Sequence, residues 1–89
     1  MPKIYSKRSG RVPGGAVLVD RSTDYGNPFE IGRDGTREQV CDKYDKWICE
    51  PEQRWLRLQM RLALRGKDLV CWCEPDRCHA RTVMKIANS

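Results

Sequence analysis

Two short apolar runs, Ala16-Val17-Leu18-Val19-Asp20 and Leu69-Val70-Cys71-Trp72-Cys73, decide the fold class of this 89-residue chain. Each run is continuous rather than alternating, which is typical of a strand buried on both faces in a parallel sheet covered by helices. A strand joined to the next strand through helices favours a parallel pair with a right-handed crossover. We therefore predict an α/β fold: a small two-layer domain with a short, mostly parallel sheet and three helices.

The residues between and after these runs predict the three helices. Thr36 and Gln39 form a capping box, in which the hydroxyl and the amide each satisfy a backbone N–H at the helix start. Pro51 is expected to begin a second helix that ends before Gly66, since proline is tolerated at the first helical position and glycine is common after the last. The last helix is predicted over residues 78–88.

The second helix has a broad apolar face on which Trp55, Leu58 and Leu62 lie, and further apolar residues widen it. Trp55 and the other two tryptophans, Trp47 and Trp72, each fall on an apolar stripe or strand. We therefore expect all three to pack in the core.

The segment before the first strand differs in composition from the rest of the chain. Residues 1–15 are rich in Lys, Arg, Ser, Gly and Pro, which indicates a basic extended N-terminal arm with at most a short strand around Ile4-Tyr5. Residues 16–89 are expected to form the single α/β domain. Residues 21–35 are expected to be a loop, and loops of that length are usually functional or disordered.

Composition and charge limit the class of protein. A hydrophobic fraction of 39% indicates a globular chain, and no apolar run approaches the roughly 20 residues of a membrane span. No apolar stretch follows the charged N-terminus, so we expect no signal peptide, no membrane association and a cytoplasmic location. The net charge of +5 fits two interpretations equally: an anionic partner such as a nucleotide or nucleic acid, or a solvated basic surface.

Four potential metal ligands or nucleophiles lie close together in the chain: Cys71, Cys73, Cys78 and His79. One interpretation is a tetrahedral zinc site of the Cys₃His type. The spacing argues against it, since alternate residues on a strand lie about 6.5–7 Å apart, whereas paired zinc ligands usually converge from a tight turn. We expect neither zinc nor another cofactor. Cys41 and Cys49 are expected to be buried or inert.

The other interpretation places Cys78 and His79 in the first turn of the last helix, after Asp76 as the N-cap residue. The partial positive charge of a helix N-terminus favours a thiolate. We therefore expect Cys78 to be the most reactive thiol, and Cys78 with His79 to be the candidate catalytic residues, a thiolate–base pair. A structural hydrogen bond from His79 to the backbone is the alternative.

The loops after the two predicted strands should meet, because the carboxyl ends of parallel strands lie at one edge of the sheet, where ligands bind. Arg21 would hold a phosphate and Asn27 a base or sugar edge, with Asp24 and Gly26 in the same loop. An Asx turn that closes this loop on itself is the alternative for Asn27. A separate helix face carries four arginines that form either a partner-binding or a solvated surface: Arg54, Arg57, Arg61 and Arg65.

Two motifs carry a resemblance to a known family. The first is Asp24-Tyr25-Gly26-Asn27-Pro28-Phe29, and the second is Gly66-Lys67-Asp68-Leu69-Val70-Cys71-Trp72-Cys73 with Cys78-His79-Ala80 after it. Over about residues 16–88 the chain resembles a small family of bacteriophage and bacterial proteins, a domain of unknown function. Tyr25 stands where that family commonly has tryptophan. The resemblance implies a phage or prophage source and a reduced Rossmann-like fold, and it names no reaction.

These observations favour a protein that binds a nucleotide or a nucleic-acid-derived ligand at the two strand-end loops. Processing of that ligand is left open, because no G-x-G-x-x-G, P-loop or paired-carboxylate motif is present. The alternative is a non-enzymatic phage accessory module that binds a host protein or a nucleic acid through the arginine face. The oligomeric state is not indicated by the sequence.

Overall fold

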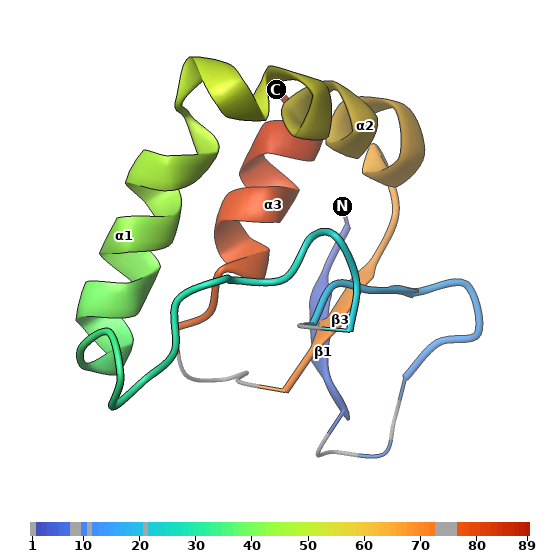
Figure 1. The fold of residues 1–89 in the computed structure, drawn as a ribbon. Helices are drawn as coiled ribbons and strands as arrows, with labels where there is room; N and C mark the ends of the chain where they lie inside the picture. Colours follow the sequence, from blue (N-terminus) through green and yellow to red (C-terminus); the bar gives the residue numbers. More distant parts are fainter. Residues whose placement is uncertain (1, 8–9, 11, 21, 73–76) are drawn as a thin grey trace.

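The computed structural model describes residues 2–7, 10, 12–20, 22–72 and 77–89. Its elements follow in the order β1 (Ile4–Ser6), β2 (Val17–Leu18), α1 (Arg37–Ile48), the 3-10 helix η2 (Pro51–Gln53), α2 (Arg54–Leu64), β3 (Leu69–Cys71) and α3 (Ala80–Ala87). In Figure 1, α3 stands between α1 and the strands, and α2 crosses near the C-terminus of the chain. The predicted α/β fold with three helices is confirmed. No helix in the described part of the chain is long and apolar enough to span a membrane.

The sheet has three parallel strands in the order β1-β3-β2. Leu69 of the central strand lies opposite Ile4 of β1 and Val17 of β2. All three residues of β3 are buried, whereas the two edge strands are half-buried. The predicted parallel pairing of the two apolar runs is confirmed.

Strand β1 comes from the segment whose composition predicts an extended arm. The short strand expected around Ile4-Tyr5 is present, and it is paired within the sheet. The N–H of Leu69 donates to the carbonyl of Lys3 at 2.9 Å, and the N–H of Lys3 donates to the carboxylate of Asp68 at 2.8 Å. A buried central strand needs backbone partners on both sides, so residues 4–6 are part of the sheet rather than of a separate arm.

Helix α1 begins as the capping box predicts. The N–H of Gln39 donates to the hydroxyl of Thr36 at 3.3 Å, and the N–H of Thr36 donates to the side-chain oxygen of Gln39 at 2.9 Å. The buried side of the helix faces a core that includes residues of α1, α2, α3 and the sheet: Val19, Tyr44, Ile48, Met60, Leu64, Leu69, Cys71, Cys78, Ala80, Val83 and Ala87.

The side of helix α2 that is buried is not the side that carries Trp55, which was expected to face the core. Met60 and Leu64 are buried, whereas Trp55, Leu58 and Leu62 are 68%, 39% and 80% exposed. The expectation that Trp55 packs in the core is therefore wrong. Apolar residues cover most of the circumference of α2, so the sequence offers two sides for burial, and packing against α3 selects the Met60 side.

Helix α3 begins at Ala80, two residues later than predicted. His79 is the N-cap residue, with φ −56° and ψ −23°, and its side chain makes no capping hydrogen bond. Cys78 therefore precedes the helix and does not lie in its first turn. Asp76, the predicted N-cap residue, lies outside the described residues.

Candidate functional site

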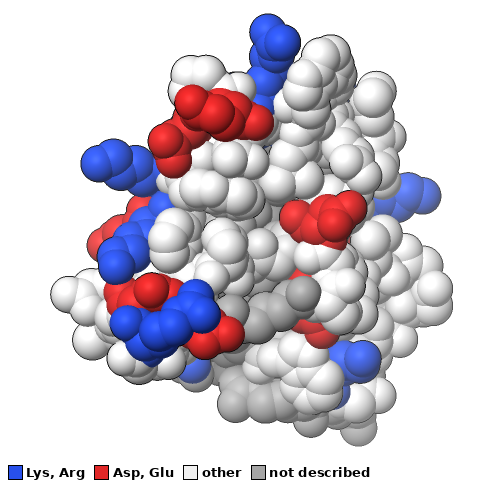
Figure 2. All heavy atoms as spheres, viewed as in Figure 1, with Lys and Arg blue, Asp and Glu red and all other residues white. Residues whose placement is uncertain are grey.

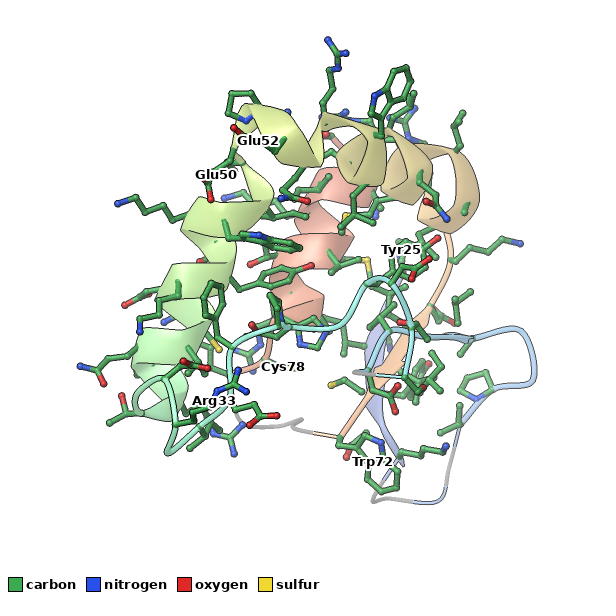
Figure 3. All side chains as sticks on the ribbon, viewed as in Figure 1. Tyr25, Arg33, Glu50, Glu52, Trp72 and Cys78 are labelled. Carbon is green, nitrogen blue, oxygen red and sulfur yellow. The ribbon has the colours of Figure 1, made fainter. Side chains whose placement is uncertain are left out.

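A cavity of about 250 Å³ lies at the carboxyl ends of the parallel strands. Its wall is formed by residues that follow β2 and β3, by the loop before α1, by the first turns of α1 and by the residues that lead into α3. They are Asp20, Ser22, Asn27, Ile31, Arg37, Val40, Cys41, Cys71, Trp72, Arg77, Cys78 and His79. The loops after the two strands thus meet at one edge of the sheet, as predicted. Figure 3 shows Cys78 at the lower end of α3 and Trp72 beyond the end of β3.

Cys78 and His79 lie side by side in this cavity, with a ring nitrogen of His79 directed at the thiol of Cys78. His79 Nε2 lies 2.6 Å from the carbonyl oxygen of Val19, and His79 Nδ1 lies 3.4 Å from Cys78 Sγ. A carbonyl can only accept, so Nε2 carries the proton, and in the neutral ring Nδ1 is then an acceptor that faces the thiol. A base held by a third group and directed at a nucleophile is the arrangement that thiol chemistry uses.

The ring of Tyr44 helps to fix the position of His79. The two ring centroids lie 5.2 Å apart in an edge-to-face arrangement, and the Tyr44 hydroxyl donates to the carbonyl of Tyr25 at 3.2 Å. Burial, with smaller contributions from Asp45 and Cys78, raises the pKa of Tyr44 well above its ordinary value. The phenol therefore remains a protonated donor throughout the physiological range.

The expected reactivity order of the thiols changes with this geometry. Cys78 is 3% exposed, and Cys41 and Cys71 are also buried, whereas Cys49 is exposed. Cys78 precedes α3 and lies against the core, so the placement on which its expected reactivity rested is wrong, and the order in which the thiols react stays a prediction. Cys73 lies outside the described residues.

Arg77 connects the residues before α3 to helix α1. Its guanidinium lies 2.5 Å from Glu38, 2.9 Å from Asp42 and 3.1 Å from Asp45, and Thr82 of α3 donates to the same Asp45. Hydrogen bonds with Glu38 and then Asp42 raise the pKa of Arg77 further above its ordinary value. Three carboxylates therefore balance the charge of Arg77. Figure 2 shows basic and acidic side chains next to one another over α1.

Two side chains of α1 reach the same segment from inside the cavity. Arg37 Nη1 donates to the carbonyl of Arg77 at 3.4 Å, and Cys41 Sγ lies 3.8 Å from that oxygen. Arg37 and Cys41 are four residues apart and so lie on one face of the helix. Through these two side chains, the start of α1 forms one wall of the cavity.

Trp72 lies at the rim of the cavity and is held by Asp20. Its indole Nε1–H donates to Asp20 Oδ2 at 2.9 Å, and the ammonium of Lys7 lies 5.3 Å from the ring centroid. The pKa of Asp20 lies below its ordinary value, chiefly because the Ser22 hydroxyl donates to it. Trp72 is 48% exposed, so the expectation of core packing is wrong for this residue too: its polar edge is bonded at the surface.

In the loop before α1, the predicted ligand-binding residues do not all reach the cavity. Asn27 lines it, but its oxygen accepts from the N–H of Phe29 at 2.9 Å and its amide donates to the carbonyl of Val40 at 3.2 Å. This is the Asx turn that was the structural alternative. Asp24 is exposed and Gly26 is in a turn, and neither lines the cavity. Arg21 lies outside the described residues.

The alternative interpretation of the cysteines, a zinc site, has no complete ligand set among the residues that the structure describes. Within residues 2–7, 10, 12–20, 22–72 and 77–89, no three His, Cys, Asp or Glu side chains are placed to hold a metal ion. Cys73, one of the four proposed ligands, is not among these residues.

The arginine face of α2 is largely engaged within the protein. Arg57 donates to the carbonyl of Ile48, the last residue of α1, at 2.8 Å and to that of Glu50, after the helix, at 2.7 Å. Arg65 donates to the carbonyl of Ser89 at 2.7 Å and to that of Ala87 at 3.1 Å, at the end of α3. These two side chains cap helix C-termini, where cations are favourable. Arg61 donates to the Ser89 hydroxyl, and Arg54 lies over the Trp55 ring.

Comparison with known families accounts for nearly the whole chain. A family model matches residues 3–89. The chain belongs to the family Domain of unknown function (DUF4326). The DUF4326 match begins before β1, so it includes all three strands as well as the cavity. No curated protein and no solved structure matches the chain.

Sequence reasoning found only part of the cavity of this DUF4326 protein. Cys78, His79 and Asn27 were singled out, whereas Asp20, Arg37 and other lining residues were missed. One signal was available for Arg37: it lies within the capping box, between Thr36 and Gln39, and it shares a helix face with Cys41. For Asp20 the signal was its position at the carboxyl end of a predicted strand.

Proposed function

We propose that this protein binds a nucleotide or a nucleic-acid-derived ligand in the cavity at the carboxyl edge of the sheet. The observation that carries the proposal is the half-exposed indole of Trp72, held by Asp20 at the rim of a largely apolar cavity. Bases stack on exposed aromatic rings, and this contact contributes about 1–3 kcal/mol per base. The position also fits the Rossmann-like arrangement that the resemblance implies, since open α/β sheets bind ligands there.

The size of the cavity limits the ligand. Pockets for drug-sized molecules measure about 300–1,000 Å³, so a cavity of about 250 Å³ suits a base or a nucleoside better than a dinucleotide. A phosphate would then lie near the opening. Val40, Cys41 and Cys71 supply an apolar wall against which a ring can pack.

Polar groups around this wall match the chemistry of a nucleotide. The carboxylate of Asp20 is an acceptor for the amino groups of a base, as Asp and Glu are for cytosine N4. Arg37 brings a guanidinium to the cavity, and its planar fork suits phosphate oxygens. Arg77 is a weaker candidate for phosphate, because three carboxylates already balance its charge.

The test is titration of bases, nucleosides and nucleoside monophosphates, followed by thermal shift and by ligand-detected NMR. Trp72→Ala is expected to lower the affinity about tenfold, the equivalent of losing one stacking contact. Trp55→Ala is the control, since it removes another exposed indole (68% exposed, against 48% for Trp72) that does not line the cavity. Absence of binding across the panel, or equal losses in both variants, would refute the proposal.

A reaction at Cys78 is the second candidate function, favoured by the directed contact between its thiol and His79. Such a reaction requires that a ligand in the cavity reach a thiol that is buried in the free protein. In a Cys49→Ser background, a small electrophile should therefore label Cys78 slowly, and a bound nucleoside should alter that rate. Labelling that no cavity ligand affects would argue against this chemistry.

The alternative of a nucleic-acid or host-protein interface on the arginine face has less support. Arg57 and Arg65 already donate to carbonyls at helix ends, which leaves fewer donors for phosphates. Binding of DNA or RNA through this face would make log affinity fall steeply with log salt. A single nucleotide in the cavity predicts a shallow slope, so titration at several salt concentrations distinguishes the two interfaces.

A further inference from the structure

Asp20 is the only acidic residue among the described residues that line the cavity. Its Oδ1 atom accepts from the N–H of Ser22 at 2.9 Å and from the Ser22 hydroxyl, and its Oδ2 atom accepts from the indole Nε1–H of Trp72 at 2.9 Å. A carboxylate has about four acceptor positions, two on each oxygen. Bonds from the described residues thus occupy both positions on Oδ1 and one on Oδ2, so the position that remains for a ligand lies on Oδ2.

The protonation state of Asp20 limits the groups of a ligand that it can bind. The Ser22 hydroxyl chiefly holds the pKa of Asp20 below its ordinary value, with smaller contributions from Trp72 and Lys7. Asp20 is therefore ionised at neutral pH, and an ionised carboxylate only accepts hydrogen bonds. Because Oδ2 is bonded to the edge of the Trp72 ring, a base stacked on that ring brings its own edge groups close to Oδ2. Figure 3 shows this ring beyond the end of β3.

We propose that Asp20 selects bases that carry an exocyclic amino group, such as cytosine and adenine, over uracil and hypoxanthine, which carry an oxo group instead. The inference rests on the proposed nucleotide binding and names the class of base. An amino group donates to a carboxylate, as cytosine N4 does to Asp or Glu. An oxo group at the same place has no proton to donate, and the negative charge of Asp20 repels it. The ring N–H of uracil does not remove this conflict, because an oxo group flanks it on each side.

A guanidinium on the other side of the cavity gives the ligand a direction. Arg37 begins α1, which lies across α3 from the strands in Figure 1, whereas Asp20 and Trp72 follow β2 and β3. A guanidinium suits phosphate oxygens, so the phosphate of a nucleotide would lie toward Arg37 and the amino edge of its base toward Asp20. A ribose hydroxyl is another donor for Asp20, but it would not distinguish two nucleosides that differ only in the base.

Isothermal titration calorimetry of the full chain with two matched pairs, cytidine with uridine and adenosine with inosine, tests the selection. Within each pair, the amino nucleoside should bind about tenfold to a hundredfold more tightly, the contribution of a hydrogen bond to a charged group. Asp20→Asn should remove most of this preference, because an amide donates to an oxo group as well as accepting from an amino group. Asp24→Asn is the matched control, since it makes the same change at an exposed residue of the same loop that does not line the cavity.

A second variant keeps the test valid if Asp20→Asn alters the loop. Trp72→Phe retains a ring and the carboxylate, so it should retain the preference for amino nucleosides even if every affinity falls. Equal affinities within both pairs, or a preference that survives Asp20→Asn in a chain whose circular dichroism is unchanged, overturns the selection while nucleotide binding stands. Absence of binding by all four nucleosides and by their monophosphates overturns the selection and the proposed function together.

Discussion

Substitution of Gly35 by alanine should destabilise the protein more than substitution of any other loop glycine of similar backbone conformation. Gly35 precedes the N-cap residue of α1 and has φ +137°, a region that side chains rarely adopt. A Cβ added there would lie 2.7 Å from Gln39 Oε1 and 2.8 Å from Gln39 Cβ. The Gln39 oxygen could swing away, but its Cβ is fixed to the helix. Relief of the contact therefore requires movement of the capping box.

The magnitude follows from two contributions. A positive φ at alanine costs about 1–2 kcal/mol. Loss of the hydrogen bond between Gln39 and the N–H of Thr36, with the accompanying shift of the side chain, adds about 1–2 kcal/mol. We expect Gly35→Ala to lower the free energy of unfolding by about 2–4 kcal/mol, a large part of the roughly 5–10 kcal/mol typical of a small domain. Gly32→Ala is the matched control, because Gly32 has φ +93° with open space around it.

Urea unfolding followed by circular dichroism and tryptophan fluorescence measures both variants. Gly32→Ala should lose only about 1–2 kcal/mol, the conformational cost alone. In a Gln39→Ala background the box is already broken, so Gly35→Ala should cost less than it does in the wild type. Two results would refute this explanation: Gly35→Ala and Gly32→Ala lower the free energy of unfolding equally, or the effects of Gly35→Ala and Gln39→Ala are fully additive. Either result would show that the capping box is not the cause of the extra destabilisation at Gly35.

Three further predictions concern single side chains. Tyr44→Phe removes the hydroxyl that donates to the carbonyl of Tyr25, and should lower the free energy of unfolding by about 1–2 kcal/mol; an unchanged urea midpoint contradicts this. The Ser22 hydroxyl chiefly lowers the pKa of Asp20, so the carboxylate stabilises the fold above its unfolded-state pKa of about 3.9 and loses this effect as the pH falls through the lower folded-state value. When the pH is lowered from about 5 to 2, the free energy of unfolding should therefore fall more for the wild type than for Asp20→Asn. Parallel plots of unfolding free energy against pH for the two proteins would contradict this. Finally, mild alkylation and peptide mapping should label Cys49 before the buried cysteines, and the reverse order would refute their burial.

The amino-acid sequence by itself determined the features that depend on neighbouring residues. Thr36 and Gln39 are three residues apart, and their reciprocal hydrogen bonds set the start of α1 wherever that helix packs. The two apolar runs are each short and continuous, which indicated two strands, and the helices between them favoured a parallel pair. Burial on both faces was correct for β3 but wrong for β2, which is half-buried because it lies at the edge of the sheet. From these features the meeting of the two strand-end loops followed directly.

Only the tertiary structure decided which groups those elements bring together. Helix α2 is apolar on two sides, and contact with α3, distant in the sequence, determines that Met60 is buried and Trp55 exposed. Likewise, the sequence allows a short strand around Ile4-Tyr5, but only the folded chain shows that it pairs with β3 as part of the sheet. The contact between His79 and Val19, which are 60 residues apart, also exists only in the folded chain. Caps and periodicity act within a few residues, whereas burial and pairing depend on partners that only the folded chain supplies.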